Sequence, residues 1–246
     1  MTKGNRDLTR KTGTATTTRG ASSSGDLAAF LQAAERIKPA PGGKGRVILA
    51  LDATMSRQPT WDLAVNIQGE MFEAVDNATP LHMQLVYFRG YGECRASNWA
   101  TEGQSLAGMM SRITCHAGRT QIGKVLTHAR KAHAKTPISA MVYIGDAMEE
   151  DADAIGHRAG ELGVLGVPVF VFQEGHDRKA EVVFKEIARL TRGSWFRFDR
   201  NAPKVLADLL SSIAVYATGG LKALTARGTK SDRLLIDHMK GDGGKK

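Results

Sequence analysis

Three oxygen-bearing side chains stand at alternate positions after an apolar run of strand length. The run covers residues 47–51, and the side chains that follow are Asp52, Thr54 and Ser56. Alternate side chains of extended backbone lie on the same side, so this spacing brings one carboxylate and two hydroxyls together. A hard divalent cation such as Mg²⁺ takes oxygen ligands of this kind and keeps several waters. The pattern therefore predicts a cation-binding loop.

Two further oxygen ligands occur later in the chain. Asp146 follows the apolar run 140–144, and Thr120 opens a helical pattern in AGRTQIGKVL. Taken singly, the Thr and Ser residues also fit helix N-caps or turns. Two carboxylates at the ends of neighbouring strands, however, repel each other unless they share a cation. We therefore predict a site for Mg²⁺ or Mn²⁺ formed by Asp52, Thr54, Ser56, Thr120 and Asp146.

The elements that must position these residues alternate along the chain. Strand-like runs lie at residues 47–51, 83–88, 140–144, 167–172 and 194–198, with a short candidate at 93–97. Helical patterns lie around residues 61–75, 106–113, 122–129, 155–162, 183–190 and 205–216. This alternation predicts an α/β fold: a Rossmann-like, doubly wound, mainly parallel sheet of six strands with helices on both faces.

Composition divides the chain into four segments. Residues 1–25 form a basic tail that is predicted to be disordered, and residues 26–44 contain a short helix (27–38) and a Pro/Gly-rich linker. Residues 45–218 form the α/β domain. Residues 219–246 form a second basic tail, for which partial helix stays open.

The order and spacing of the five predicted ligands resemble the von Willebrand factor A (VWA) domain and its metal-ion-dependent adhesion site (MIDAS). That motif is Asp-x-Ser-x-Ser after the first strand, a Thr in a Gly-rich loop, and an Asp after the fourth strand. Thr54 replaces the usual first Ser, and Gly145-Asp146-Ala147 replaces the common Thr-Asp-Gly. The resemblance covers about residues 45–218. It implies a six-stranded sheet with one short antiparallel edge strand.

The resemblance also implies a function. In such domains the hydroxyls contact the cation, the carboxylates act directly or through water, and a Glu or Asp of a protein partner completes the coordination. We therefore expect a non-enzymatic, cytoplasmic, bacterial adaptor that works within an intracellular assembly. Related intracellular domains imply an AAA+ ATPase or its complex as the partner.

The charge of the chain leaves two alternatives open. The formal net charge is +9, but residues 1–25 and 221–246 each contribute +4, which leaves +1 for the residues between them. Nucleic-acid binding through the tails is one alternative. The other is a phosphoester hydrolase that uses Asp52, Asp146 and the ion as a Lewis acid, although no nucleophile or general base is evident. No run approaches the ~18–20 apolar residues of a membrane span, so we expect no membrane association.

Two neighbouring features have more than one interpretation. The acidic run at residues 149–153 fits either an outer acidic shell of a metal site or the N-terminus of the helix that carries Ile155, where carboxylates complement the helix dipole; we predict the second. Arg119, next to Thr120, either steers an acidic group of a partner or is an ordinary solvated arginine.

Overall fold

The computed structural model describes residues 45–58, 61 and 81–198, together with 208, 211, 212, 214, 215, 223 and 225–229. The predicted N-terminal tail, helix and linker therefore lie outside the described residues. So do nearly all of the helical pattern at 61–75, much of the pattern at 205–216, and most of the C-terminal tail.

The described strands form one sheet in the order β3-β2-β1-β4-β5-β6. Neighbouring strands are parallel, except that β3 pairs antiparallel with β2 at the edge. The predicted mainly parallel sheet with one short antiparallel edge strand is confirmed. The strands are β1 (Gly45–Asp52), β2 (Leu81–Arg89), β3 (Glu93–Ala96), β4 (Ala140–Gly145), β5 (Val169–Glu174) and β6 (Ser194–Phe198).

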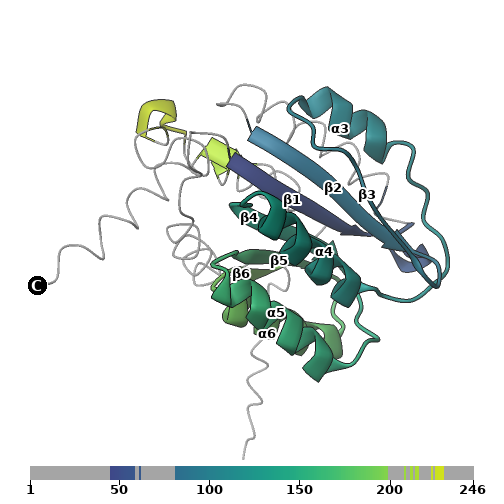
Figure 1. Cartoon of the computed structure of the whole chain (residues 1–246). Helices are drawn as coiled ribbons and strands as arrows, with labels where there is room; N and C mark the ends of the chain where they lie inside the picture. The colour runs from purple at the N-terminus through teal and green to yellow at the C-terminus, as the bar shows by residue number, and fades with distance from the viewer. Residues whose placement is uncertain are drawn as a thin grey trace, which may run out of the picture.

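Both faces of the sheet are covered, which explains why the central strands are continuously apolar. Side chains of β1 alternate between two cores: Ile48 and Ala50 pack in the first, and Leu49 and Leu51 in the second. Three helices lie over the first core, on one face of the sheet (Figure 1). The described helical segments are η1 (Met55–Arg57), α3 (Gly103–Met110), α4 (Ile122–Lys135), α5 (Ala152–Val164) and α6 (Arg178–Thr191).

Several predicted boundaries differ from the structure by a few residues, and two of the differences involve a buried apolar residue. The helical pattern at 106–113 ends at Met110; the buried Ile113 lies beyond the helix, where its carbonyl accepts a hydrogen bond from Trp61 Nε1 (3.0 Å). The strand predicted at 167–172 begins at Val169 and continues to Glu174. In both cases an apolar residue outside the regular element is buried by tertiary packing. Among the described residues, no helix is long and apolar enough to cross a bilayer.

Tyr143 gives a first prediction. Its side chain is fully buried on β4 between Phe88 and Phe184, and its hydroxyl has no hydrogen-bond partner within the described residues. An unpartnered buried hydroxyl costs about 1–3 kcal/mol, so Tyr143→Phe is expected to raise the free energy of unfolding by about 1 kcal/mol in urea denaturation. Tyr87→Phe is the control, because the Tyr87 hydroxyl contacts Glu93 (3.5 Å). A less stable Tyr143→Phe variant would contradict the prediction.

Candidate functional site

Two carboxylates lie at the carboxyl edge of neighbouring parallel strands. Asp52 is the last residue of β1, and Asp146 directly follows β4. The register pairs Leu51 with Ile144, so the two carboxylates follow adjacent strand ends. Strand order reverses at this point, because β2 lies on the other side of β1. In open α/β sheets, ligands bind at such a switch point.

Asp52 is fully buried and only partly hydrogen-bonded. Its Oδ1 accepts the backbone N–H of Thr54 (2.8 Å), and its Oδ2 has no partner among the residues the structure describes. Burial raises the pKa of Asp52 to about 6, and the charge of Asp146 adds to the rise, against hydrogen bonds from Thr54 and the charge of Arg57. The carboxylate is therefore held in an environment that disfavours its negative charge.

Asp146 has the same incomplete pairing. Its side chain is half-buried, and its buried Oδ1 likewise has no hydrogen-bond partner in the described part of the chain. A buried carboxylate oxygen without a partner is costly. Two such oxygens at adjacent strand ends match the requirement of a shared cation.

The hydroxyls of Thr54 and Ser56 lie within hydrogen-bonding distance of each other. Thr54 occupies the N-cap position of η1, but its side chain makes no capping hydrogen bond. Its Oγ1 lies 3.0 Å from Ser56 Oγ, with Thr54 buried and Ser56 exposed. Thr54 therefore stands at the N-cap position of η1 without capping it through its side chain.

Thr120 is buried and is hydrogen-bonded to the loop that follows β4. Its N–H donates to Oε2 of Glu149 (3.2 Å), and the N–H of Glu149 donates to the Thr120 hydroxyl (3.0 Å). The N-cap residue of α4 is Gln121, so Thr120 does not cap this helix either. The reciprocal pair joins the Thr120 loop to the segment that carries Asp146.

The acidic run serves two helices, which corrects the prediction that it belongs to one. Asp151 caps α5, as Oδ1 accepts the N–H of Ala154 (2.7 Å). Glu150 instead accepts the N–H groups of Ile122 and Gly123 at the start of α4. Burial raises the pKa of Glu150, and these two hydrogen bonds oppose the rise. Glu149 and Glu150 thus hold the start of α4 and Thr120 against the β4–α5 loop.

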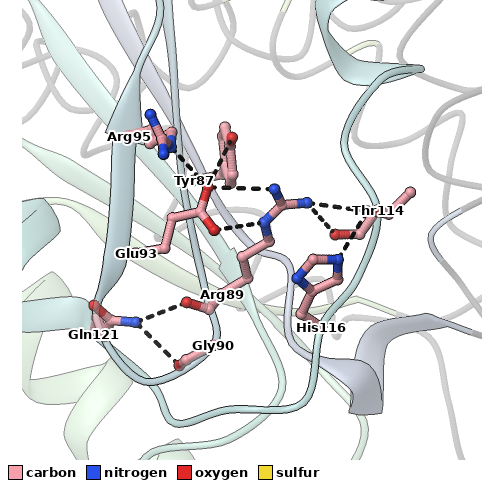
Figure 2. Close-up of polar contacts among 8 residues, drawn as sticks. All are labelled: Tyr87, Arg89, Gly90, Glu93, Arg95, Thr114, His116 and Gln121. Carbon is pink, nitrogen blue, oxygen red and sulfur yellow. Dashed lines mark hydrogen bonds and ion pairs between the residues drawn. The ribbon is translucent and has the colours of Figure 1, made fainter.

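The loop before Thr120 packs against the residues that directly follow β1. The backbone of His116 pairs with Thr54, and its N–H donates to the carbonyl of Ala53 (3.1 Å). Arg89, the last residue of β2, donates from Nη1 to the carbonyl of Thr114 (2.8 Å) and to its hydroxyl (3.0 Å). Glu93 holds the Arg89 guanidinium from β3 (2.9 Å). Figure 2 shows Arg89 between Glu93 and Thr114, with His116 beside them.

The β2–β3 hairpin supports the same loop through its backbone. Gln121 Nε2 donates to the carbonyls of Arg89 (3.1 Å) and Gly90 (3.3 Å), as Figure 2 shows. The N–H of Arg119 also donates to Gly90 (3.1 Å). Sequence patterns did not single out Arg89, Glu93 or Gln121 as supports of the site. Gly90 and Gly92, which follow the strand predicted at 83–88, are the local feature that permits this close approach, since Gly90 has a positive φ of 60°.

A buried ion pair crosses the same edge. Arg57, at the end of η1, is 1% exposed and forms a salt bridge with Glu174 at the end of β5. In the sheet, β4 lies between β1 and β5, so this pair links the first ligand loop to the strand beyond Asp146. No local pattern indicated the pairing.

The donor set fits a hard divalent cation. The described residues contain no group of three or more His, Cys, Asp or Glu that could hold a metal. The five predicted residues are of another kind, since they combine two carboxylates with three hydroxyls at one edge. Octahedral ligands about 2.0–2.1 Å from Mg²⁺ lie about 2.9 Å from their neighbours, close to the 3.0 Å between the Thr54 and Ser56 oxygens.

Comparison with known proteins identifies the fold. No protein-family model and no curated protein matches the chain, whereas many solved structures do. A von Willebrand factor type A protein from Catenulispora acidiphila has a TM-score of 0.58 at 15% identity, over 72% of this chain and 43% of its own length. The VWA domain of SpRpn10 has a TM-score of 0.54 at 13% identity, over 68% and 93%.

A third similar structure is proximal thread matrix protein 1 from the mussel byssus, with a zinc-occupied MIDAS motif. It has a TM-score of 0.55 at 15% identity, over 72% of this chain and 47% of its own length. The matched region thus spans less than half of the mussel and Catenulispora chains. At these identities the likeness concerns the fold alone: this protein has a VWA-like α/β fold.

Proposed function

We propose that this protein is a binding module that holds a divalent cation at the carboxyl edge of β1 and β4. Through the cation it binds an acidic side chain of a protein partner. The observation that carries the proposal is the pair of buried carboxylate oxygens, Asp52 Oδ2 and Asp146 Oδ1, which have no hydrogen-bond partner within the described residues. The ligands are Asp52, Thr54, Ser56, Thr120 and Asp146, and the ion is Mg²⁺ or Mn²⁺.

The chemistry of the ligand set explains the need for an acidic partner. The two carboxylates balance the charge of the cation. The three hydroxyl ligands are neutral, so they leave the cation electrophilic enough to attract a further anionic ligand. A coordination position that faces solvent then favours a carboxylate over water. The module acts by binding, without turnover. A protein of the AAA+ class within an intracellular assembly is the partner that the sequence resemblance implies.

Calorimetric titration with Mg²⁺ and Mn²⁺ tests the metal site. The native protein is expected to bind one ion, and Asp146→Asn is expected to weaken binding more than about tenfold, a loss of about 1.4 kcal/mol. Asp151→Asn is the matched control: it removes a neighbouring negative charge from an exposed position, and Asn caps a helix as well as Asp. Equal heats from the native protein and Asp146→Asn would show that the ion does not bind here.

A further inference from the structure

Acidic and basic residues lie in different segments at the carboxyl edge of the sheet. On the β4 side, residues 146–153 include five acidic residues and no basic one. On the β2 side, Glu93 of the hairpin is paired with Arg89 and Arg95, and four basic residues lie at the end of β2 and along residues 112–124. We call this group the basic rim: Arg89, Arg112, Arg119 and Lys124.

Contacts with the hairpin and the Thr120 loop place the rim beside the site. Arg89 ends β2, and Arg112 lies two residues before Thr114, which Arg89 contacts. The backbone of Arg119 is bonded to Gly90, and Lys124 Nζ donates to the carbonyl of Gly92 (2.9 Å). The predicted ligand Thr120 directly follows Arg119. The basic rim therefore adjoins the metal site next to Thr120, which Glu149 of the acidic loop also contacts.

Arg119 is the rim residue best placed to bind a second group. Arg89 is engaged with Glu93, and Lys124 with Gln121 and Gly92. The Arg119 side chain is exposed, and no hydrogen bond or ion pair to its guanidinium occurs within the described residues. Its backbone is fixed by the hydrogen bond to Gly90. A guanidinium that extends from a fixed backbone, and that has no other partner in the described part of the chain, suits a carboxylate, which it binds with two parallel hydrogen bonds.

A large side chain extends the same surface. Tyr91, at the tip of the β2–β3 hairpin between Gly90 and Gly92, is 82% exposed. Exposed tyrosines are frequent anchors in protein interfaces. Net charge also disfavours the ends of the chain as occupants of the rim, because residues 1–25 and 221–246 each carry a net charge of +4.

We propose that the partner segment carries two acidic groups, of which the first completes the cation and the second pairs with Arg119. The segment then runs from the metal site past Arg119 toward the β2–β3 hairpin and Tyr91. This proposal rests on the function proposed above and specifies the direction and charge of the partner. Electrostatic complementarity of this kind sets orientation and selects among partners.

Synthetic peptides test the second contact. Capped glycine peptides of equal length carry either one Glu or two Glu residues separated by one to three glycines, and are titrated by NMR in Mg²⁺ and in EDTA. In Mg²⁺, the best two-Glu peptide is expected to bind about fivefold more tightly than the one-Glu peptide, as for a good surface ion pair. Arg119→Gln is expected to remove this advantage and to leave Mg²⁺ binding and one-Glu binding unchanged.

The control and the contradicting outcomes separate the two proposals. Arg192→Gln removes an exposed arginine at the end of α6 and is expected to keep the fivefold advantage. If Arg119→Gln keeps the advantage, or weakens both peptides equally, the second contact is wrong while the metal-mediated contact stands. If Mg²⁺ binds but no peptide does, both proposals are wrong. Self-association that depends on Mg²⁺ and is lost in Arg119→Glu would identify the occupant as a second copy and overturn the acidic partner segment.

Discussion

Asp52→Asn is expected to stabilise the metal-free protein at neutral pH and to abolish the stabilisation that Mg²⁺ gives to the native chain. Asp52 is fully buried, and burial together with Asp146 raises its pKa from 3.8 to about 6. This rise in pKa corresponds to a cost of about 3 kcal/mol for holding the charge in the folded state. The amide of Asn carries no charge, and its oxygen can still accept the N–H of Thr54.

The effect depends on pH in a defined direction. Because the folded-state pKa of Asp52 lies above the unfolded value, the folded protein binds more protons between 3.8 and about 6. Stability from this group therefore falls as the pH rises through that window. The gain from Asp52→Asn should be absent below the window and reach at most about 3 kcal/mol above it.

Denaturation in EDTA and in excess Mg²⁺ measures both parts of the prediction. A ligand that binds only the folded state stabilises it according to its concentration and dissociation constant. Native protein should gain stability with Mg²⁺, whereas Asp52→Asn should not respond. Asp151→Asn, which removes an exposed charge nearby, should show neither change. If Asp52→Asn is less stable than the native protein at neutral pH in EDTA, the interactions of the carboxylate outweigh its burial cost, and the prediction is wrong.

Local sequence patterns were sufficient for the fold and for the strand ends at which Asp52 and Asp146 lie. The apolar runs before Asp52 and Asp146 are continuous because both faces of β1 and β4 are buried, and this feature distinguishes a central parallel strand from a half-exposed one. The prediction that these strands are neighbours is confirmed by the pairing of Leu51 with Ile144. Whether the five residues bind a metal stays a prediction.

The supports of the site could not be predicted, because they join distant segments. Arg57 and Glu174 are 117 residues apart, and Glu150 reaches back 28 residues to Ile122. Helix-capping rules are local, so they assigned Glu149 and Glu150 to the nearest helix. In the folded chain the N-terminus of α4 lies within hydrogen-bonding distance of Glu150, and Glu150 accepts its N–H groups there.

Gly118→Ala is expected to abolish most of the Mg²⁺ affinity while the protein remains folded. A Cβ at this position would lie 2.0 Å from the carbonyl oxygen of Gly90 and 2.3 Å from its carbonyl carbon. Both atoms belong to backbone that the β2–β3 hairpin holds in place, so the loop with Gly118 must move. Thr120 lies two residues further on, and its displacement would remove one hydroxyl ligand from the proposed site.

A second glycine provides the matched control at the far edge of the sheet. In Gly193→Ala the new Cβ would lie 1.9 Å from the carbonyl oxygen of Val169, just before β6 begins. Overpacking of this kind costs about 1–3 kcal/mol of unfolding free energy, and we expect a loss in that range from each variant. Calorimetry should then show Mg²⁺ affinity reduced more than about tenfold in Gly118→Ala, a loss of about 1.4 kcal/mol, and unchanged in Gly193→Ala. Native-like Mg²⁺ binding by Gly118→Ala would show that the Thr120 loop does not contribute to the site.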